Sequence, residues 1–298
     1  MAGRLSRRRF LSASATSVAA LGPAAAALGP AAAALASGAS ETEAGAGRLK
    51  QSVCRWTLPG PLPEVCQRVR GLGLKAIDLL HTDEWEVARS AGLTCSMGYA
   101  SRRDHFIENG FNDPANHAML IEELTTAIPL AAQAGVPNVI AMFGNRRGRG
   151  ETEAIADCAA GLAKVAPLAE RHGVTVCVEL LNSKVDHPDY QGDHSAFGAA
   201  VMEKVGSPRV KLLYDIYHMQ IMEGDVIRTI GQHRRWIGHF HTGGVPGRHD
   251  IDASQELNYH AVATAIADGG FEGYIAHEFT AKGEPYAGLA EACRICQV

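Results

Sequence analysis

The stretch Glu151–Asn182 reads ETEAIADCAAGLAKVAPLAERHGVTVCVELLN, and it contains one complete helix-to-strand unit. Apolar residues recur at every third or fourth position of its first part, which is the spacing of one buried helix face. Gly173 follows at the position where a glycine C-cap, with left-handed backbone angles, is expected to end the helix. The segment Val174–Asn182 is then almost wholly apolar, as a parallel strand covered on both faces must be. The stretch therefore predicts an α/β fold with parallel strands.

The same alternation of strand and helix runs through the rest of the chain. Strands are expected at Gln51–Trp56, Leu74–Leu80, Leu93–Tyr99, Asn138–Gly144, Val174–Asn182, Val210–His218, Trp236–Thr242 and Gly273–Thr280. Helices are expected at Pro61–Gly71, Asp83–Ala91, Pro114–Ala134, Glu151–His172, Asp193–Val205, Met222–His233, Asn258–Gly269 and Ala287–Cys296. Eight units in about 250 residues favour a closed, eight-stranded (β/α)8 TIM barrel over an open doubly wound sheet. The glycine-rich dinucleotide fingerprint of open sheets is missing after the first strand, where Trp56–Gly60 reads WTLPG.

The N-terminus has the features of an export signal. Ser6–Leu11 reads SRRRFL, a twin-arginine pattern, and a long alanine-rich apolar stretch follows it. Ala34–Ala36 reads ALA and offers a cleavage site. We therefore expect a twin-arginine signal peptide over residues 1–36, a small polar linker over residues 37–48 and the barrel over residues 49–298. Cleavage would leave a periplasmic or extracellular protein with no membrane segment; an N-terminus that is unstructured or anchors the chain in a membrane is the alternative.

Charge and cysteine content exclude some classes of function. The formal net charge is −4, and the leader carries four arginines and no acid, so the rest of the chain is more acidic still. An acidic domain without a basic run is a poor binder of nucleic acids. The seven cysteines argue against a complete disulfide framework, because their number is odd. Cys293 and Cys296 have the spacing of a redox or disulfide pair, and the sequence leaves their state open.

Four late strands carry acidic or histidine side chains near their C-terminal ends. These residues are Glu179, Asp215, His241 and Glu278. A buried carboxylate costs several kcal/mol unless it is paired or bound to metal, and the C-terminal ends of barrel strands meet at one mouth. Three carboxylates and one imidazole suit Mn2+, Mg2+, Co2+ or Zn2+. We therefore predict a divalent metal site there, against the alternative that each residue is a satisfied structural group.

Other polar residues near these strand ends receive different interpretations. His239 shares a strand face with His241, and we expect it to lie behind the ligands or in the core. His277 precedes Glu278 and should point the opposite way. The pairs Asp186–His187 and Asp193–His194 are expected in a solvated loop or lid. Trp56 is either an apolar wall of the pocket or ordinary barrel packing, and Asn182 and Lys184 could reach the mouth.

At these residues the sequence resembles the hydroxypyruvate isomerase family of the xylose-isomerase-like sugar isomerase and epimerase superfamily. The resemblance is carried by Val178–Asn182, Tyr214–Met222, Ile237–His241, Pro246–His249, Glu256–Tyr259 and His277–Phe279. It implies that Glu179, Asp215, His241 and Glu278 hold the metal and that Glu179 and Glu278 are also the catalytic acid/base pair. It further implies that His218 and Arg248 bind the substrate, a role in which we include Asn182. Hydroxypyruvate isomerases often carry Gln where this chain has His241, and they are mostly cytoplasmic.

The chemistry implied is proton transfer between adjacent carbons of a small hydroxy-carbonyl substrate through an enediolate. Hydroxypyruvate and tartronate semialdehyde are the expected pair, since Arg248 could bind the carboxylate. A ketose 3-epimerase or another sugar epimerase is the first alternative. A periplasmic carbohydrate-binding barrel without catalysis is the second. The sequence leaves the choice of metal open, as well as whether the chain forms a homo-oligomer.

Overall fold

The computed structural model describes residues 47–298. The expected export signal and most of the expected linker lie outside the described residues, so both stay predictions. Within the described part, no helix has the length and apolar character needed to cross a membrane.

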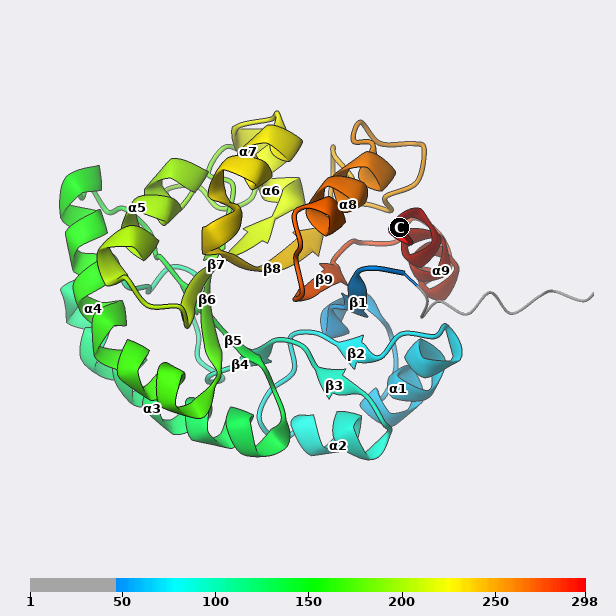
Figure 1. The fold of residues 1–298 in the computed structure, drawn as a ribbon, viewed down its shortest axis with the longest axis horizontal. Helices are drawn as coiled ribbons and strands as arrows, with labels where there is room; N and C mark the ends of the chain where they lie inside the picture. The colour runs from blue at the N-terminus through cyan, green and yellow to red at the C-terminus, as the bar shows by residue number, and fades with distance from the viewer. Residues whose placement is uncertain (1–46) are drawn as a thin grey trace, which may run out of the picture. The chain divides into compact units, whose positions relative to one another are not determined.

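Within residues 47–298, nine parallel strands form the centre of the fold. Their bounds are Lys50–Val53 (β1), Ala76–Ile77 (β2), Thr94–Cys95 (β3), Gly98–Tyr99 (β4), Asn138–Met142 (β5), Thr175–Leu180 (β6), Val210–Asp215 (β7), Ile237–Thr242 (β8) and Tyr274–His277 (β9). Seven of them make one sheet in the order β1-β9-β8-β7-β6-β5-β4, and β2 pairs with β3. The first and last strands of the chain are therefore neighbours, which curls the sheet into a barrel-like form (Figure 1).

Helices surround this sheet on the outside (Figure 1). The α-helices are Leu62–Gly71 (α1), Trp85–Ser90 (α2), His117–Ala134 (α3), Glu151–His172 (α4), Ser195–Val205 (α5), Ile216–Met222 (α6), Val226–His233 (α7), Tyr259–Asp268 (α8) and Pro285–Ile295 (α9). Short 3-10 helices span Arg55–Thr57 (η1), Pro114–Asn116 (η2) and Arg234–Trp236 (η3). The predicted cap at Gly173 is confirmed: it ends α4 in the left-handed region with φ 69°.

The prediction of a closed ring of eight strands is confirmed in part. The expected strand Leu93–Tyr99 is divided into β3 and β4, and β2 is only two residues long. Isolated parallel bridges at Cys54–Asp78 and Leu80–Gly98 continue the pairing from β1 through the β2 segment to β4. Between residues 76 and 99 the ladder is thus a series of short contacts rather than a continuous strand pair.

The predicted strand Val210–His218 is too long by three residues, and the reason is a helix cap. Asp215 ends β7, and its Oδ1 accepts hydrogen bonds from the backbone N–H groups of Tyr217 and His218. An aspartate in this position satisfies two of the first free donors of a helix. The chain therefore turns directly into α6, and the single helix expected over Met222–His233 is instead the end of α6 followed by α7. In the same way, Trp56 lies in η1 rather than at the end of a strand.

Candidate active site

The four predicted metal ligands lie together at the C-terminal ends of neighbouring strands. Glu179 is in β6, Asp215 ends β7, His241 is in β8, and Glu278 directly follows β9. All four are buried, and one ligand atom from each lies within 4.8 Å of the others. The structure thus brings the whole predicted ligand set into one cluster.

Strand register places these residues level with one another. Asp215 pairs with His241 across the β7–β8 ladder. Thr242 pairs with His277 across the β8–β9 ladder, and the N–H of Glu278 donates to the carbonyl of Thr242 at 2.9 Å. Because parallel strands keep their C-terminal ends at one edge of the sheet, side chains that are far apart in sequence meet there.

The two ring nitrogens of His241 face different groups. Nε2 contacts Asp78 Oδ2 at 2.9 Å. Nδ1 lies 2.6 Å from Glu278 Oε2 and 3.4 Å from Glu179 Oε1, yet it has no hydrogen-bond partner in an acceptable geometry. Burial opposes a second proton on His241, but Cys54 and Glu278 raise its pKa well above the usual value when no cation is bound. A neutral imidazole whose Nε2 donates to a carboxylate presents a lone pair at Nδ1, where a cation can take the place of that second proton. With three carboxylates around it, that nitrogen completes a donor set that fits a divalent cation.

The carboxylates of the cluster differ in their proton affinity. Burial and the neighbouring Glu278 and Glu179 raise the pKa of Asp215 to about 7, although Arg248 acts against this. Burial would raise the pKa of Glu278 as well, but Arg248 and His241 beside it hold that pKa well below its usual range. Close carboxylates without a counter-charge cannot all ionise freely, so the cluster is a place where positive charge is strongly stabilised.

Arg248 is one source of that positive charge. Its Nη2 donates to Asp215 Oδ2 at 2.9 Å and to Glu278 Oε2 at 2.5 Å. The guanidinium lies over the rings of Trp56 and Tyr217, at 5.7 and 5.3 Å from their centroids. Its Nε has no hydrogen-bond partner although it is buried. Arg248 is thus placed at the ligand cluster with a donor to spare, as expected of a residue that binds substrate oxygens.

His218 is held in one orientation by Asn182. The Nδ1 of His218 lies 2.6 Å from Asn182 Nδ2, and the backbone N–H of Asn182 donates to the same nitrogen at 3.2 Å. Nδ1 is therefore the acceptor, so the proton belongs on Nε2, which lies 3.6 Å from Asp215 Oδ2 and has no hydrogen-bond partner. Burial and Arg248 lower the pKa of His218 well below its usual value. The ring is thus a neutral donor beside the ligand cluster.

The side chain of Asn182 is hydrogen-bonded within the protein at both of its polar atoms. Its Nδ2 donates to Asp186 Oδ2 at 2.6 Å, besides its contact with His218. Its Oδ1 accepts the backbone N–H groups of Val185 and Asp186. All of its hydrogen-bonding capacity is used within the protein. These bonds hold Asn182 against His218, and the substrate-binding role of Asn182 stays a prediction.

The two glutamates of the cluster are held differently. Glu278 accepts a hydrogen bond from Trp56 Nε1 at 2.8 Å on Oε1, and Arg248 occupies Oε2. Among the described residues, no hydrogen bond reaches the side chain of Glu179, and this residue lines a cavity of about 210 Å³. Trp56, Tyr99, Phe106, His187, Arg248 and Glu278 also line that cavity. Glu179 is thus the carboxylate of the pair that faces the cavity without a protein donor among the described residues.

Several residues outside the cluster lie as expected, and some do not. His277 bonds to Gln51 and Thr242, away from the cluster. Lys184 donates to the carbonyls of Ile221 and Met222. Asp78 directly follows β2 and is fully buried, and it was not among the predicted site residues. The signal was present, because Ala76–Leu80 reads AIDLL, an acid inside an apolar run.

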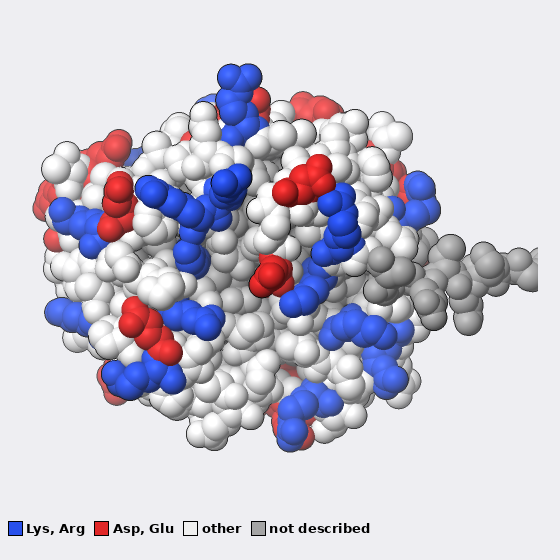
Figure 2. Space-filling model, in the orientation of Figure 1, with Lys and Arg blue, Asp and Glu red and all other residues white. Residues whose placement is uncertain are grey.

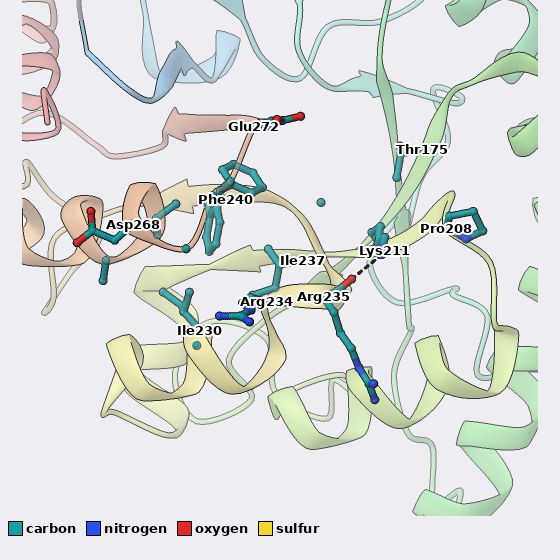
Figure 3. Close-up of a pocket in the computed structure, with 18 residues that line it drawn as sticks. Thr175, Pro208, Lys211, Ile230, Arg234, Arg235, Ile237, Phe240, Asp268 and Glu272 are labelled. Carbon is teal, nitrogen blue, oxygen red and sulfur yellow. Dashed lines mark hydrogen bonds between the residues drawn. The ribbon is translucent and has the colours of Figure 1, made fainter.

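A cavity larger than the one beside Glu179 lies at the other end of the strands. It measures about 810 Å³ and is bordered by the first residues of β6, β7 and β8, including Thr175, Lys211 and Ile237. Figure 3 shows its side chains, with Lys211 bonded to the backbone of Arg235. It contains none of the predicted site residues. Active sites of barrels form at the C-terminal ends of the strands, so the smaller cavity beside Glu179 is the candidate active site.

Comparison with known proteins identifies the family of this chain. The model of the family described as "Xylose isomerase-like TIM barrel" matches residues 69–297. The chain belongs to the xylose isomerase-like TIM barrel family. A mouse protein named "Putative hydroxypyruvate isomerase" is 28% identical over 248 residues, covering 78% of this chain and 88% of that protein. The 2-oxo-tetronate isomerase of Cupriavidus necator is 37% identical over 128 residues, 43% of this chain and 48% of that protein.

Solved structures of the xylose isomerase-like fold are similar as well. D-psicose 3-epimerase of Clostridium cellulolyticum, solved with D-tagatose, has a TM-score of 0.64 at 18% identity and covers 84% of this chain and 100% of that chain. The IOLI protein, solved with a zinc atom, has a TM-score of 0.65 at 17% identity and covers 83% and 95% of the two chains. At these identities the structures bear on the fold alone. The family and the names of the sequence relatives place this chain among isomerase enzymes.

Proposed function

We propose that this protein is a divalent-metal-dependent isomerase that moves a proton between adjacent carbons of a small hydroxy-carbonyl acid, with hydroxypyruvate and tartronate semialdehyde as the substrate pair. The proposal rests on one observation above all: the buried cluster of three carboxylates around the partnerless Nδ1 of His241. Relatives named for hydroxypyruvate and 2-oxo-tetronate support the class of substrate.

Glu179, Asp215, His241 and Glu278 are the residues that would hold the cation. A divalent cation, when bound, supplies Lewis-acid stabilisation of negative charge that develops on the substrate carbonyl oxygen. The protein's own groups do the rest of the chemistry described below.

Glu179 is the proposed base. Its carboxylate faces the cavity and has no protein donor among the described residues, so one oxygen can remove the proton from the substrate carbon. The same carboxylate can return the proton to the neighbouring carbon, and the isomerisation is complete when the hydroxyl proton has also passed from one substrate oxygen to the other. Glu278 keeps its charge and position, because Trp56 and Arg248 hold both of its oxygens.

His218 and Arg248 are the proposed substrate contacts. Neutral His218 offers its Nε2 proton to a substrate oxygen, and the bond from Asn182 keeps the ring in that tautomer. Arg248 has an unused Nε donor next to the cavity, which suits a substrate carboxylate. A group prepositioned in this way stabilises a developing oxyanion without having to reorganise.

The first test measures metal content and proton exchange. Protein purified without chelators should contain a first-row divalent metal by elemental analysis. In heavy water it should incorporate deuterium at the reacting carbon of hydroxypyruvate, followed by NMR. Glu179→Gln should abolish both exchange and turnover, and Glu278→Gln should abolish solvent exchange and turnover by disturbing the ligand set, while both variants keep the fold. Retained turnover in Glu179→Gln would remove the proposed base.

A ketose 3-epimerase is the second candidate. Glu278 also borders the cavity, and epimerisation needs an acid/base group on each face of the reacting carbon. That reaction requires Glu278 Oε1 to be released by Trp56. A panel of hydroxypyruvate, 2-oxo-tetronate, D-fructose and D-tagatose separates the two: epimerised ketose with no reaction of the acids favours the epimerase. Binding of sugars without any exchange favours a carbohydrate-binding barrel.

Location and partners are further proposals. The twin-arginine pattern and the alanine-rich stretch after it support export to the periplasm or beyond. Charged groups of both signs are interspersed over the face in Figure 2, with no large basic patch among the described residues there. We propose a small-molecule substrate and no nucleic-acid partner. Size-exclusion chromatography with light scattering would show whether the chain forms a homo-oligomer.

A further inference from the structure

Asp78 lies beneath the ligand cluster and is fully buried. It follows β2, and its backbone pairs with that of Cys54 at the end of β1. A buried carboxylate in the interior of a barrel is costly unless its oxygens are bonded. Both carboxylate oxygens of Asp78 have hydrogen-bond partners, and these partners indicate its role.

Four side chains contact Asp78 from three other parts of the barrel. Cys54 Sγ lies 3.8 Å from Oδ2. Oδ1 accepts the hydroxyl of Ser96. Oδ2 contacts His241 Nε2 at 2.9 Å and His239 Nε2 at 3.2 Å. A carboxylate without a proton can only accept, so both imidazoles donate their Nε2 protons to the same oxygen.

The bond from His241 determines which of its nitrogens faces the cluster. A neutral imidazole carries one proton, and if Nε2 holds it, Nδ1 is left with a lone pair. Nδ1 is the nitrogen that lies beside Glu278 and Glu179. The ring of His239 meets that of His241 edge to face, with centroids 5.3 Å apart and an interplanar angle of 82°. This contact leaves the His241 ring little freedom to rotate about its position.

We propose that Asp78 is a positioning residue that fixes His241 in the Nε2-protonated tautomer and thereby sets the affinity of the four-residue cluster for a divalent cation. The inference rests on the proposed metal-dependent function. It assigns a role to a residue that does not reach the cavity, and it explains why an acid stands in the short β2 segment. Partners of metal-ligating histidines typically change metal affinity by about 10- to 100-fold when they are removed.

The test compares the cation affinity of three apo-proteins by calorimetric titration with Mn2+. Asp78→Asn keeps the size of the side chain but loses the charge that orders the two imidazoles, so affinity should fall about 10- to 100-fold. His239→Gln is the matched control, because it can still donate to Asp78 and leaves the bond from His241 in place. Its affinity should stay within about threefold of the wild type. Asp78→Asn that binds Mn2+ as tightly as the wild type would overturn the inference.

A second measurement needs no variant, in case Asp78→Asn fails to fold. Long-range 1H–15N NMR of the wild type loaded with Zn2+ reports which nitrogen of each histidine carries a proton. His241 should carry it on Nε2; a proton on Nδ1 would overturn the inference. Failure of the broader proposal looks different, because a wild type that binds no divalent cation would remove the metal-dependent function itself.

Discussion

Trp56 is the residue that most clearly distinguishes the surroundings of Glu278 from those of Glu179. Its side chain is 48% exposed, so it contributes little to the core, yet its Nε1 donates to Glu278 Oε1. A hydrogen bond to a charged group contributes about 1.5–3 kcal/mol. The indole also lies against Arg248. Trp56 therefore both donates to the carboxylate of Glu278 and covers the guanidinium that neutralises this carboxylate.

Trp56→Phe should lower kcat about tenfold, which corresponds to about 1.4 kcal/mol, with a smaller change in KM. The variant keeps an aromatic wall but loses the donor to Glu278. Because that donor lowers the pKa of Glu278, the acid limb of the kcat/KM profile should move to higher pH. Steady-state kinetics across pH measures both effects. Trp236→Phe is the control, since Trp236 lies in η3 away from the cluster; equal kinetics in both variants would contradict the role of Trp56.

Much of the candidate site could be predicted one residue at a time. An acid in a strand buried on both faces is a costly exception, and that rule alone identifies Glu179, Asp215 and Glu278. The same rule applies to Asp78, but β2 has only two residues and gives a weak strand signal. The contact of Asn182 with His218 could not be predicted, because His218 lies 36 residues away and only the folded chain brings the two together.

At the level of elements, boundaries were harder to predict than identities. The apolar spacing located α4 with the same bounds as the structure, Glu151–His172. The β7–α6 boundary was misplaced because the side chain of Asp215 caps a helix, an effect that hydrophobic periodicity does not register. The third expected strand is divided into β3 and β4 because the pairing around β2 is discontinuous. This pairing depends on segments far away in the sequence, so local sequence could not predict it.

Gly161→Ala should destabilise the fold by about 1–3 kcal/mol through overpacking. Gly161 lies inside α4, where a Cβ would come within 2.6 Å of Phe111 Cδ1 and 2.8 Å of His117 Nε2. Helix α4 can therefore approach the segment around η2 only because this position lacks a side chain. Chemical denaturation monitored by circular dichroism gives the free energy of unfolding.

The control for this prediction is Gly231→Ala in α7. A Cβ at Gly231 meets no atom within 4 Å, so the better helix propensity of alanine should stabilise the protein by about 0.5–1 kcal/mol. Opposite signs for the two variants would show that packing, and not helix propensity, decides the residue at position 161. A neutral or stabilising Gly161→Ala would contradict the close packing of α4.

At the scale of the whole molecule, closure of the barrel determines the electrostatics of the site. Closure of the sheet brings Glu179, Asp215 and Glu278 together beside His241. Asp78 contacts the other ring nitrogen of His241. In such an interior, a charge on any one of these residues without a partner would carry a large desolvation free energy. The fold therefore holds several acidic groups close together, and the negative charge of this cluster depends on pH and on whether a cation is bound.

Cation affinity should fall below about pH 7, by about tenfold for each pH unit if one proton is displaced. Burial and the neighbouring carboxylates raise the pKa of Asp215 to about 7 without a cation. Below that pH a cation must displace the proton of Asp215, whereas above it the carboxylate is already charged. Without a cation the folded state holds this proton more tightly than the unfolded state, so the contribution of Asp215 to stability is lost as pH rises toward 7.

Thermal melts with and without Mn2+ measure both consequences together. The rise in Tm caused by the cation should be small near pH 5.5 and large near pH 8, since binding to the folded state alone stabilises it in proportion to the logarithm of affinity. Asp215→Asn removes the titrating group and should leave a small rise that is nearly independent of pH. A wild type whose Tm rises equally at both pH values would show that Asp215 is ionised throughout, and it would remove the carboxylate repulsion from which the metal site is argued.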